Sequence, residues 1–503
     1  MASIEGQTLG AERARQLLRR TGFGARPAEV AVYASLEAGV AVDRLLDFKP
    51  SRFKPSGSGS GGRVKQHNAW IKYLVGQKPP EALREKLVLF WHDHFATAIS
   101  KVVDAKLMGV QNQTLRQHCA GDMKALVKAM HVDPAMLQWL DTVRNLKAIP
   151  NENYAREFLE LFTLGVVDLS GNANYVQDDV VQIARAFTGH SYGGRRQLHT
   201  FDLGQHDTTT EFPMRGPKAI FQSTGGFGAA GRDYLTYPTA LDELDPAQAQ
   251  HEIDQVTDIV FEHRDVDGEN TVARRTAARL LEFFAHGGFA QPSPALIAVI
   301  DDVLARSGFG QGASPSWSIA GLVREILLDD EFYASLGDAA KKSVKWPVDF
   351  YAATVRLLQL KLLGRDARVA GQFHRSCHEQ LADMGQTVFD PPSVFGWEWE
   401  AGWVGSKTLL ARYAFAVDAI TARSVGGLDP GKLIDLGLSD PGQIVDAVTE
   451  LLGVGSDLSA AERDVLVSYL GTGPLDLADD QTRNEKLHGL IGLVLQSPAY
   501  QLH

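Results

Sequence analysis

The chain has 503 residues, 44% of them hydrophobic and 22% charged, and this length allows one large domain or several ordinary ones. Its 61 acidic and 50 basic residues give a net charge of -11, which disfavours nucleic acid as a partner. No apolar run approaches the roughly 18 to 20 residues that a membrane-spanning helix needs, so we expect no membrane span. The two cysteines, Cys119 and Cys377, are too few for a disulfide framework, and whether they pair stays open.

Apolar residues recur with helical spacing along most of the chain, whereas the alternating patterns of strands are scarce. We therefore predict a mainly α protein, a large single helical domain over residues 1–503 built as an orthogonal helix bundle. The predicted helices cover residues 10–21, 27–47, 67–77, 80–98, 103–131, 134–141, 151–164, 176–188, 248–263, 269–286, 293–306, 315–334, 346–362, 406–424, 441–452, 459–470 and 482–496.

Three segments interrupt the helical pattern. Residues 56–62 have the composition of a flexible loop, and we expect them to loop out between two helices. Residues 190–246 are rich in Gly, Thr, Pro and aromatic residues, which predicts a short irregular or β-hairpin insertion. Residues 384–406 place several aromatic residues around Pro391 and Pro392, too apolar for a solvated loop, so we expect this aromatic loop to fold back over the body.

The helix predicted over 80–98 carries two histidines with different surroundings. His94 continues an apolar stripe through Leu83, Leu87 and Trp91, which places it on the core side. His92 is rotated from it by about 200°, so the two imidazoles reach one metal only if the helix ends there. A hydrogen-bonded core histidine is the alternative for His94.

A third histidine, His118, lies beside the apolar stripe of the helix predicted over 103–131. Asp122 follows one helical turn later, where its carboxylate is able to accept from the ring and fix the tautomer. A plain surface interaction between the two side chains explains the spacing equally well.

The densest polar signal is the segment NENYAREFLELFTLG, residues 151–165. A turn of 100° per residue places Glu152, Arg156, Glu160 and Thr163 on one stripe, and surface ion pairing explains that stripe without any function. Glu157 falls at the edge of the apolar face, where partial burial raises the pKa of a carboxyl group. It is our best single candidate for a general acid or base.

Several strings of the sequence resemble those of the bacterial family known as domain of unknown function number eighteen hundred. The matching strings are LLRRTGFG (17–24), LREKLVLFWHDHFAT (83–97), QNQTLRQH (111–118), DPAMLQWLD (133–141), NENYAREFLELFTLG (151–165), DDVVQIARAFTG (178–189), KWPVDF (345–350) and MGQTVFDPPSVFGWEWEAGWVGSKTLLAR (384–412). The resemblance implies one continuous helical domain, an extracytoplasmic setting and a sulfatase-like partner protein. Its polar signature falls on His92, His94, Arg116, His118, Asn151, Glu152, Asn153, Arg156, Glu157 and Glu160.

The first functional hypothesis is a hydrolase acting on a small molecule, a carbohydrate or another polymer by acid–base chemistry. Its candidate catalytic residues are Glu157, Glu152, Glu160, His94, His118 and Arg156, with Asp141 as a further partner carboxylate. The candidate substrate-binding residues are Asn153, Tyr154, Arg116, Trp91, Trp397 and Trp403, the tryptophans and Trp139 serving as stacking surfaces for sugars.

Two alternatives belong to other classes. One is a helical oxidoreductase with a divalent metal or haem held by His92, His94, His118 and Glu157. The other is a non-catalytic helical scaffold or partner-binding protein whose polar stripes are structural ion pairs. The N-terminal segment shows no apolar stretch of a secretory signal, so the compartment stays open. The protein is either cytoplasmic or exported with its leader removed, and the family resemblance indicates the periplasm or secretion.

Overall fold

The computed structural model describes residues 3–54, 62–194, 198–207, 218–221, 235–236, 246–362, 368–369, 372–373, 376–421 and 428–503. Within these ranges the protein is mainly α, as predicted. The first half contains α1 (Gly10–Thr21), α2 (Pro27–Ala34), α3 (Ala38–Leu46), α4 (Gly62–Val75), α5 (Pro79–His94), α6 (Ile99–Val102), α7 (Ala105–His118), α8 (Met123–His131), α9 (Pro134–Trp139), α10 (Asn153–Glu157), the π-helix η2 (Phe158–Thr163) and α11 (Gln177–Ala186).

The second half is also helical. It contains α12 (Pro246–Glu262), α13 (Thr271–Phe284), α14 (Pro294–Ser307), α15 (Ile319–Leu328), α16 (Pro347–Leu357), α17 (Cys377–Asp383), α18 (Ser406–Thr421), α19 (Pro441–Leu452), α20 (Ala460–Leu470), α21 (Asp480–Thr482), the π-helix η11 (Arg483–Leu487), α22 (His488–Gln496) and α23 (Pro498–Gln501).

The strands of the described residues form three small antiparallel pairs. The first is the predicted hairpin in the 190–246 segment, where β1 (His190–Gly193) pairs with β2 (Leu198–Phe201). The same segment contributes β3 (Ala219–Ile220) paired with β4 (Leu235–Thr236), and a third pair joins β5 (Arg368–Val369) to β6 (Gln372–Phe373). The flexible loop predicted at 56–62 lies outside the described residues except for Gly62, which begins α4.

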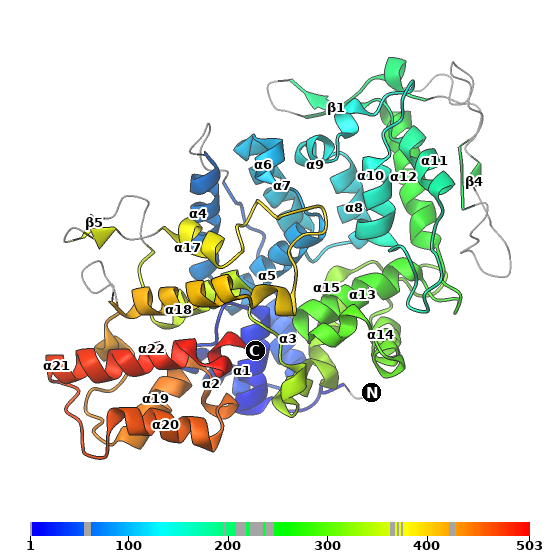
Figure 1. The fold of residues 1–503 in the computed structure, drawn as a ribbon. Coiled ribbons are helices and arrows are strands. Elements are labelled where there is room, and N and C mark those ends of the chain that lie inside the picture. Colours follow the sequence, from blue (N-terminus) through cyan, green and yellow to red (C-terminus); the bar gives the residue numbers. More distant parts are fainter. Residues whose placement is uncertain are drawn as a thin grey trace.

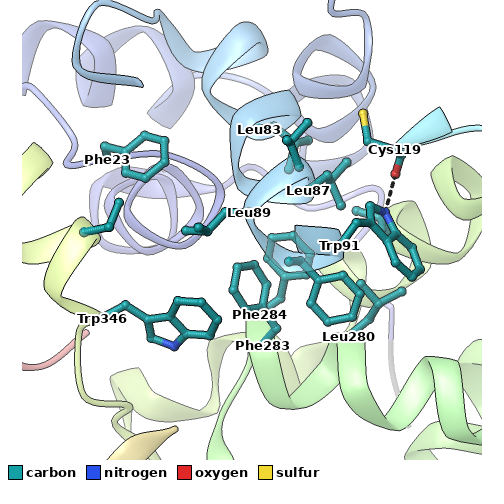
Figure 2. Packing of buried hydrophobic residues seen from close by; sticks show 14 of the residues in the cluster. Phe23, Leu83, Leu87, Leu89, Trp91, Cys119, Leu280, Phe283, Phe284 and Trp346 are labelled. Atoms are coloured by element: carbon teal, nitrogen blue, oxygen red, sulfur yellow. Dashed lines mark hydrogen bonds between the residues drawn. The ribbon is translucent and has the colours of Figure 1, made fainter. Parts of the chain in front are cut away.

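Helix α5 runs through the middle of the molecule and contacts α1, α3 and α7 (Figure 1). Leu83, Leu87 and Trp91 lie one turn apart along its buried face, and Phe283 and Phe284 of α13 pack near them (Figure 2). Because burying each such side chain stabilises the fold by about 1.5 to 3 kcal/mol, this packing holds α5 and α13 in place. The indole Nε1–H of Trp91 is satisfied by the carbonyl oxygen of Cys119 at 2.9 Å.

The N-terminal and C-terminal helices pack against each other. Arg15 of α1 pairs with Glu450 of α19 at 2.6 Å, and Arg19 pairs with Asp457 at 2.7 Å. Val344 forms a bridge with Leu502 beside them. The buried hydrophobic cluster accordingly extends from Ile4 to Tyr500, so the N-terminal helices and the C-terminal helices share one core (Figure 1).

Two predicted helices are broken in the structure by contacts between distant segments. The helix expected over 27–47 divides into α2 and α3 because the carbonyl oxygen of Leu36 accepts from the backbone N–H of Leu9. The helix expected over 103–131 divides into α7 and α8 because Gly121 pairs with Ile319 and the side chain of Asp122 caps α8. The short helix α17, which begins at a capping box of Ser376 and Glu379, was not predicted.

No helix among the described residues has the length and the apolar character needed to cross a membrane. The two cysteines are both free and buried. This answers the question of pairing that the sequence left open.

Candidate active site

A cavity of about 300 Å³ lies where the C-terminal end of α5, the π-helix η2, α13 and the 384–406 loop meet. Its lining combines one histidine, charged residues and an apolar rim. The lining includes Asp93, His94, Leu161, Val167, Arg274, Arg275, Arg279, Glu282 and Phe395. A cavity of this size that combines apolar walls with a few converging polar groups is typical of ligand sites.

His94 is the one predicted site residue that lines this cavity. Its Nε2 lies 3.2 Å from the carbonyl oxygen of Phe162, and since a carbonyl only accepts, Nε2 carries the proton. Nδ1 therefore has a lone pair, and no described residue donates to it. Burial, followed by the positive charges of Arg279 and Arg275, lowers the pKa of His94 to about 3, so the ring is neutral.

His92 and Asp93 bond to the 384–406 loop and hold it against α5, and Asp93 also lines the cavity. His92 Nε2 accepts from the backbone N–H of Phe389 at 2.9 Å. Asp93 accepts from the backbone N–H of Trp397 at 2.8 Å and from the indole N–H of Trp399 at 2.9 Å. The loop therefore lies over the body. We call these two side chains the loop anchor, because their hydrogen bonds hold the loop in place.

Three arginines of α13 line the cavity and differ in their partners. Arg274 is held by Asp265, Asp267 and Asp301 at 2.7 to 2.8 Å. Arg279 pairs with Glu282 at 2.6 Å and lies over the ring of Trp399. Arg275 makes no hydrogen bond or ion pair with any described residue, and its Nε is fully buried without a partner. Burial first, then the charge of Arg279, lowers the pKa of Arg275 to about 10.

Two carboxyl groups of the cavity are tuned by their surroundings. Burial raises the pKa of Glu282, and the neighbouring Arg279 opposes that rise. Burial also raises the pKa of Asp93 to about 6, against the charge of Arg279 and the hydrogen bonds from the loop. Glu282 is ion-paired with Arg279 at 2.6 Å, which favours its carboxylate, so it becomes a proton donor only when another anion takes over that pairing.

The segment 151–165 follows its predicted face only as far as Phe158. From there it winds as the π-helix η2, with the backbone N–H of Leu164 bonded to the carbonyl of Leu159. The wider turn moves Thr163, predicted on the polar stripe, into the interior, and Glu160 instead accepts from the Tyr175 hydroxyl at 3.1 Å. A pattern of 100° per residue cannot anticipate this shift.

Glu157 is half-buried, and burial together with the nearby Glu160 raises its pKa to about 7, in the direction the sequence predicted. It does not line the cavity. Glu152 and Arg156 pair with each other at 2.9 Å and with Gln177, which gives the surface network that the sequence offered as an alternative. Asn153 is exposed beside them.

The metal set His92, His94, His118 and Glu157 is not assembled. Among the described residues, no group of three or more His, Cys, Asp or Glu side chains is placed to hold a metal ion. His118 ends α7 away from the cavity lining, and burial lowers its pKa. Asp122 does not orient His118 through a hydrogen bond, because its carboxylate accepts from the backbone N–H of Ala125.

Most of the residues predicted to bind substrate are buried and bonded to other residues of the fold. Arg116 is buried against Glu85 and Asn112, and the Tyr154 hydroxyl is bonded to His131 Nδ1 at 2.6 Å. Burial speaks against three of the predicted stacking surfaces, since a ring buried in the core has no face free for a sugar. The buried rings are those of Trp91, Trp397 and Trp403, and Trp139 is half-buried with the Lys101 ammonium over it.

Asp93, Arg275, Arg279 and Glu282 were missed from the sequence. The signal that indicates them is the spacing of Arg275 and Arg279, four residues apart on a helix, with Glu282 three residues further on the same face. That pattern is also typical of a surface ion-pair ladder, so sequence alone does not separate the two cases.

Comparisons with known proteins identify a family and no activity. No curated protein matches the chain. No solved structure matches it either. A family model described as "Protein of unknown function (DUF1800)" matches residues 16–502, nearly the whole chain, and the resemblance noted in the sequence is thereby confirmed. The protein belongs to this family.

Proposed function

We propose that this protein is a hydrolase whose active site is the cavity between α5 and α13. The observation that carries the proposal is the neutral imidazole of His94, which has a fixed tautomer and an unbonded Nδ1 and which lines the same cavity as Arg275, whose guanidinium has no bonded partner among the described residues. A base and a cation that line one cavity are the two groups that activation of water and stabilisation of developing negative charge require.

In the proposed reaction His94 Nδ1 takes a proton from a water molecule as the water oxygen bonds to the electrophilic centre of the substrate. An anionic substrate takes over the pairing with Arg279, and Glu282, whose protonated form burial then favours, takes up a proton from solvent. The bond from the electrophilic centre to the leaving oxygen breaks, and Glu282 gives that proton to the oxygen. Arg275 stabilises the negative charge that develops on the substrate. The Phe162 carbonyl keeps the His94 ring oriented throughout, because the Nε2–H bond to it is retained.

A pKa of about 3 makes His94 a weak base in the free enzyme. Negative charge on a bound substrate would offset the potential of Arg275 and Arg279, two of the causes that lower this pKa. The imidazole therefore becomes more basic when the site is filled, which couples substrate binding to catalysis.

The test is a screen of the purified full-length protein against chromogenic 4-nitrophenyl esters, phosphates, sulfates and glycosides. For a substrate that is turned over, we expect His94→Gln and Glu282→Gln each to lower kcat/KM by about 100-fold or more. His118→Gln and Glu157→Gln are matched controls outside the cavity, and we expect each to stay within about threefold of the wild type.

The proposal fails if His94→Gln and Glu282→Gln hydrolyse the substrate as fast as the wild type. If only Glu157→Gln loses turnover, the general acid is instead Glu157, the residue that the sequence favoured. Absence of turnover for every bond class in the screen would also count against a hydrolase.

A further inference from the structure

The guanidinium of Arg275 is held in place although it has no anionic partner within bonding distance among the described residues. A Cβ on Gly165 would lie 2.6 Å from its Nη1, so the guanidinium packs directly on the backbone where η2 ends. Gly165 has φ +83° and ends the segment, and the absence of a side chain there makes room for the arginine. The donors of Arg275 are therefore positioned at the cavity wall before any ligand binds.

A cationic donor group that is largely removed from water costs free energy unless an acceptor compensates it. The neighbouring Arg274 shows how this chain provides for a structural arginine, with three carboxylates around one guanidinium. Arg279 has Glu282 and the face of Trp399. Arg275 lines the same cavity with Glu160 and Glu282 acting only through their charge and with no carboxylate bonded to it among the described residues, so its donors are open to an acceptor that a ligand supplies.

The rim of the cavity, in contrast to its charged wall, is apolar. Phe395 is 65% exposed and Val167 is 49% exposed, and both line the cavity. Phe395 lies on the 384–406 loop, next to Gly396, whose contact with Asp93 fixes the loop against α5. An apolar rim beside a partly buried cation suits a molecule with an apolar body and an anionic end.

We infer that the cavity binds an organic anion, with a carboxylate, sulfate or phosphate group accepting hydrogen bonds from Arg275 and an apolar or aromatic body packed on Phe395 and Val167. The inference rests on the proposed function, because it names the substrate class of that same site. Planar guanidinium donors match the paired oxygens of all three anionic groups, so the experiment compares them directly.

The experiment is isothermal titration of the full-length protein with three aromatic anions, benzoate, benzenesulfonate and phenylphosphonate. Acetate, sulfate and phosphate lack the ring, and benzamide lacks the charge. We expect at least one aromatic anion to bind about 10-fold or more tightly than its counterpart without the ring. Its affinity should exceed that of benzamide by a similar factor.

Two variants separate the two halves of the site. Arg275→Gln should weaken binding of the preferred anion by about 10- to 100-fold, the range for a lost hydrogen bond to a charged group. Phe395→Ser should weaken the aromatic anions and leave those without a ring unchanged. Arg324→Gln removes an arginine that pairs with Glu5, Asp43 and Glu325 elsewhere, and it should bind as the wild type does.

The thermal unfolding of Arg275→Gln supplies a second readout. Because the variant removes a desolvated charge without a partner, we expect its Tm to equal or exceed that of the wild type. Arg275→Lys keeps the charge and should retain part of the affinity. The inference is overturned if no anion binds, if benzamide binds as tightly as benzoate, or if both Arg275 variants bind as the wild type does.

The two proposals fail in different ways. His94→Gln should keep anion binding while it loses turnover. If His94→Gln abolishes turnover but Arg275→Gln leaves anion binding intact, the inference is wrong and the proposed hydrolase stands. If anions bind through Arg275 and no bond class is hydrolysed, the anion site stands and the hydrolase is wrong.

Discussion

Two groups of buried charges in this protein make a useful contrast. Around Glu85, the carboxylate is bonded to Arg84, Arg116 and the indole of Trp70, so each cation has an anionic partner, although Arg116 Nε itself is buried without a hydrogen bond. In the cavity beside α13, Arg275 has no such partner and His94 has an unbonded Nδ1. The first group is complete in its charge pairing within the fold, and it serves stability. The second group is incomplete within the fold, which is what a ligand site requires.

The largest expected effect breaks the complete group. Glu85→Ala leaves Arg84 and Arg116 buried without their shared carboxylate, so we expect the free energy of unfolding to fall by about 3 to 5 kcal/mol. Glu152→Ala, which breaks a half-exposed pair with Arg156, is the control and should cost less than about 1 kcal/mol. Urea denaturation measures both. Equal losses in the two variants would contradict the contrast.

The next effect concerns the loop anchor. An alanine at Gly396, which has φ +79°, would overlap the Asp93 carboxylate that holds the loop. Gly171 has a similar φ of +86° and no atom within 4 Å of an added Cβ, so Gly171→Ala measures the backbone cost alone. We expect Gly396→Ala to be less stable than Gly171→Ala by about 1 to 3 kcal/mol in the same urea assay. No difference between them would show that the loop is not fixed by this contact.

A smaller effect depends on pH. Burial raises the pKa of Glu157 from 4.5 to about 7, so folding favours its protonated form. The stability that this group contributes is therefore complete below its unfolded pKa and is lost as the pH rises towards 7. Glu157→Gln should remove this dependence. The free energy of unfolding of the variant, relative to that of the wild type, should therefore rise between about pH 4.5 and 7. A constant difference between the two across this range would contradict the shift.

The helices could be predicted because their apolar spacing depends only on local sequence, and the bounds of α1 and α19 agree with the prediction. Their interruptions could not, because the breaks before α3 and α8 depend on contacts with Leu9 and Ile319. The π-turn in η2 likewise defeats a pattern of constant rotation, and it changed the surroundings of Glu160 and Thr163.

The candidate site was only partly within reach of the sequence. His94 was indicated by its place on the apolar stripe of α5. Arg275 looks like any helical arginine in the sequence, and only the packing of α13 against η2 reveals that it has no acceptor. The role of Asp93 as an anchor depends on hydrogen bonds from a loop about three hundred positions further along the chain, so the sequence around Asp93 gives no signal for it.

The most direct test compares His92→Leu with His94→Gln, two changes two residues apart at the end of α5. His92→Leu leaves the Phe389 N–H without its acceptor, so we expect about 1 to 3 kcal/mol less stability and a kcat/KM within about threefold of the wild type for the folded protein. His94→Gln should unfold within about 1 kcal/mol of the wild type and lose about 100-fold or more of kcat/KM. The opposite outcome, in which His94→Gln unfolds the protein or keeps its turnover while His92→Leu abolishes it, would contradict the assignment of the cavity as the active site.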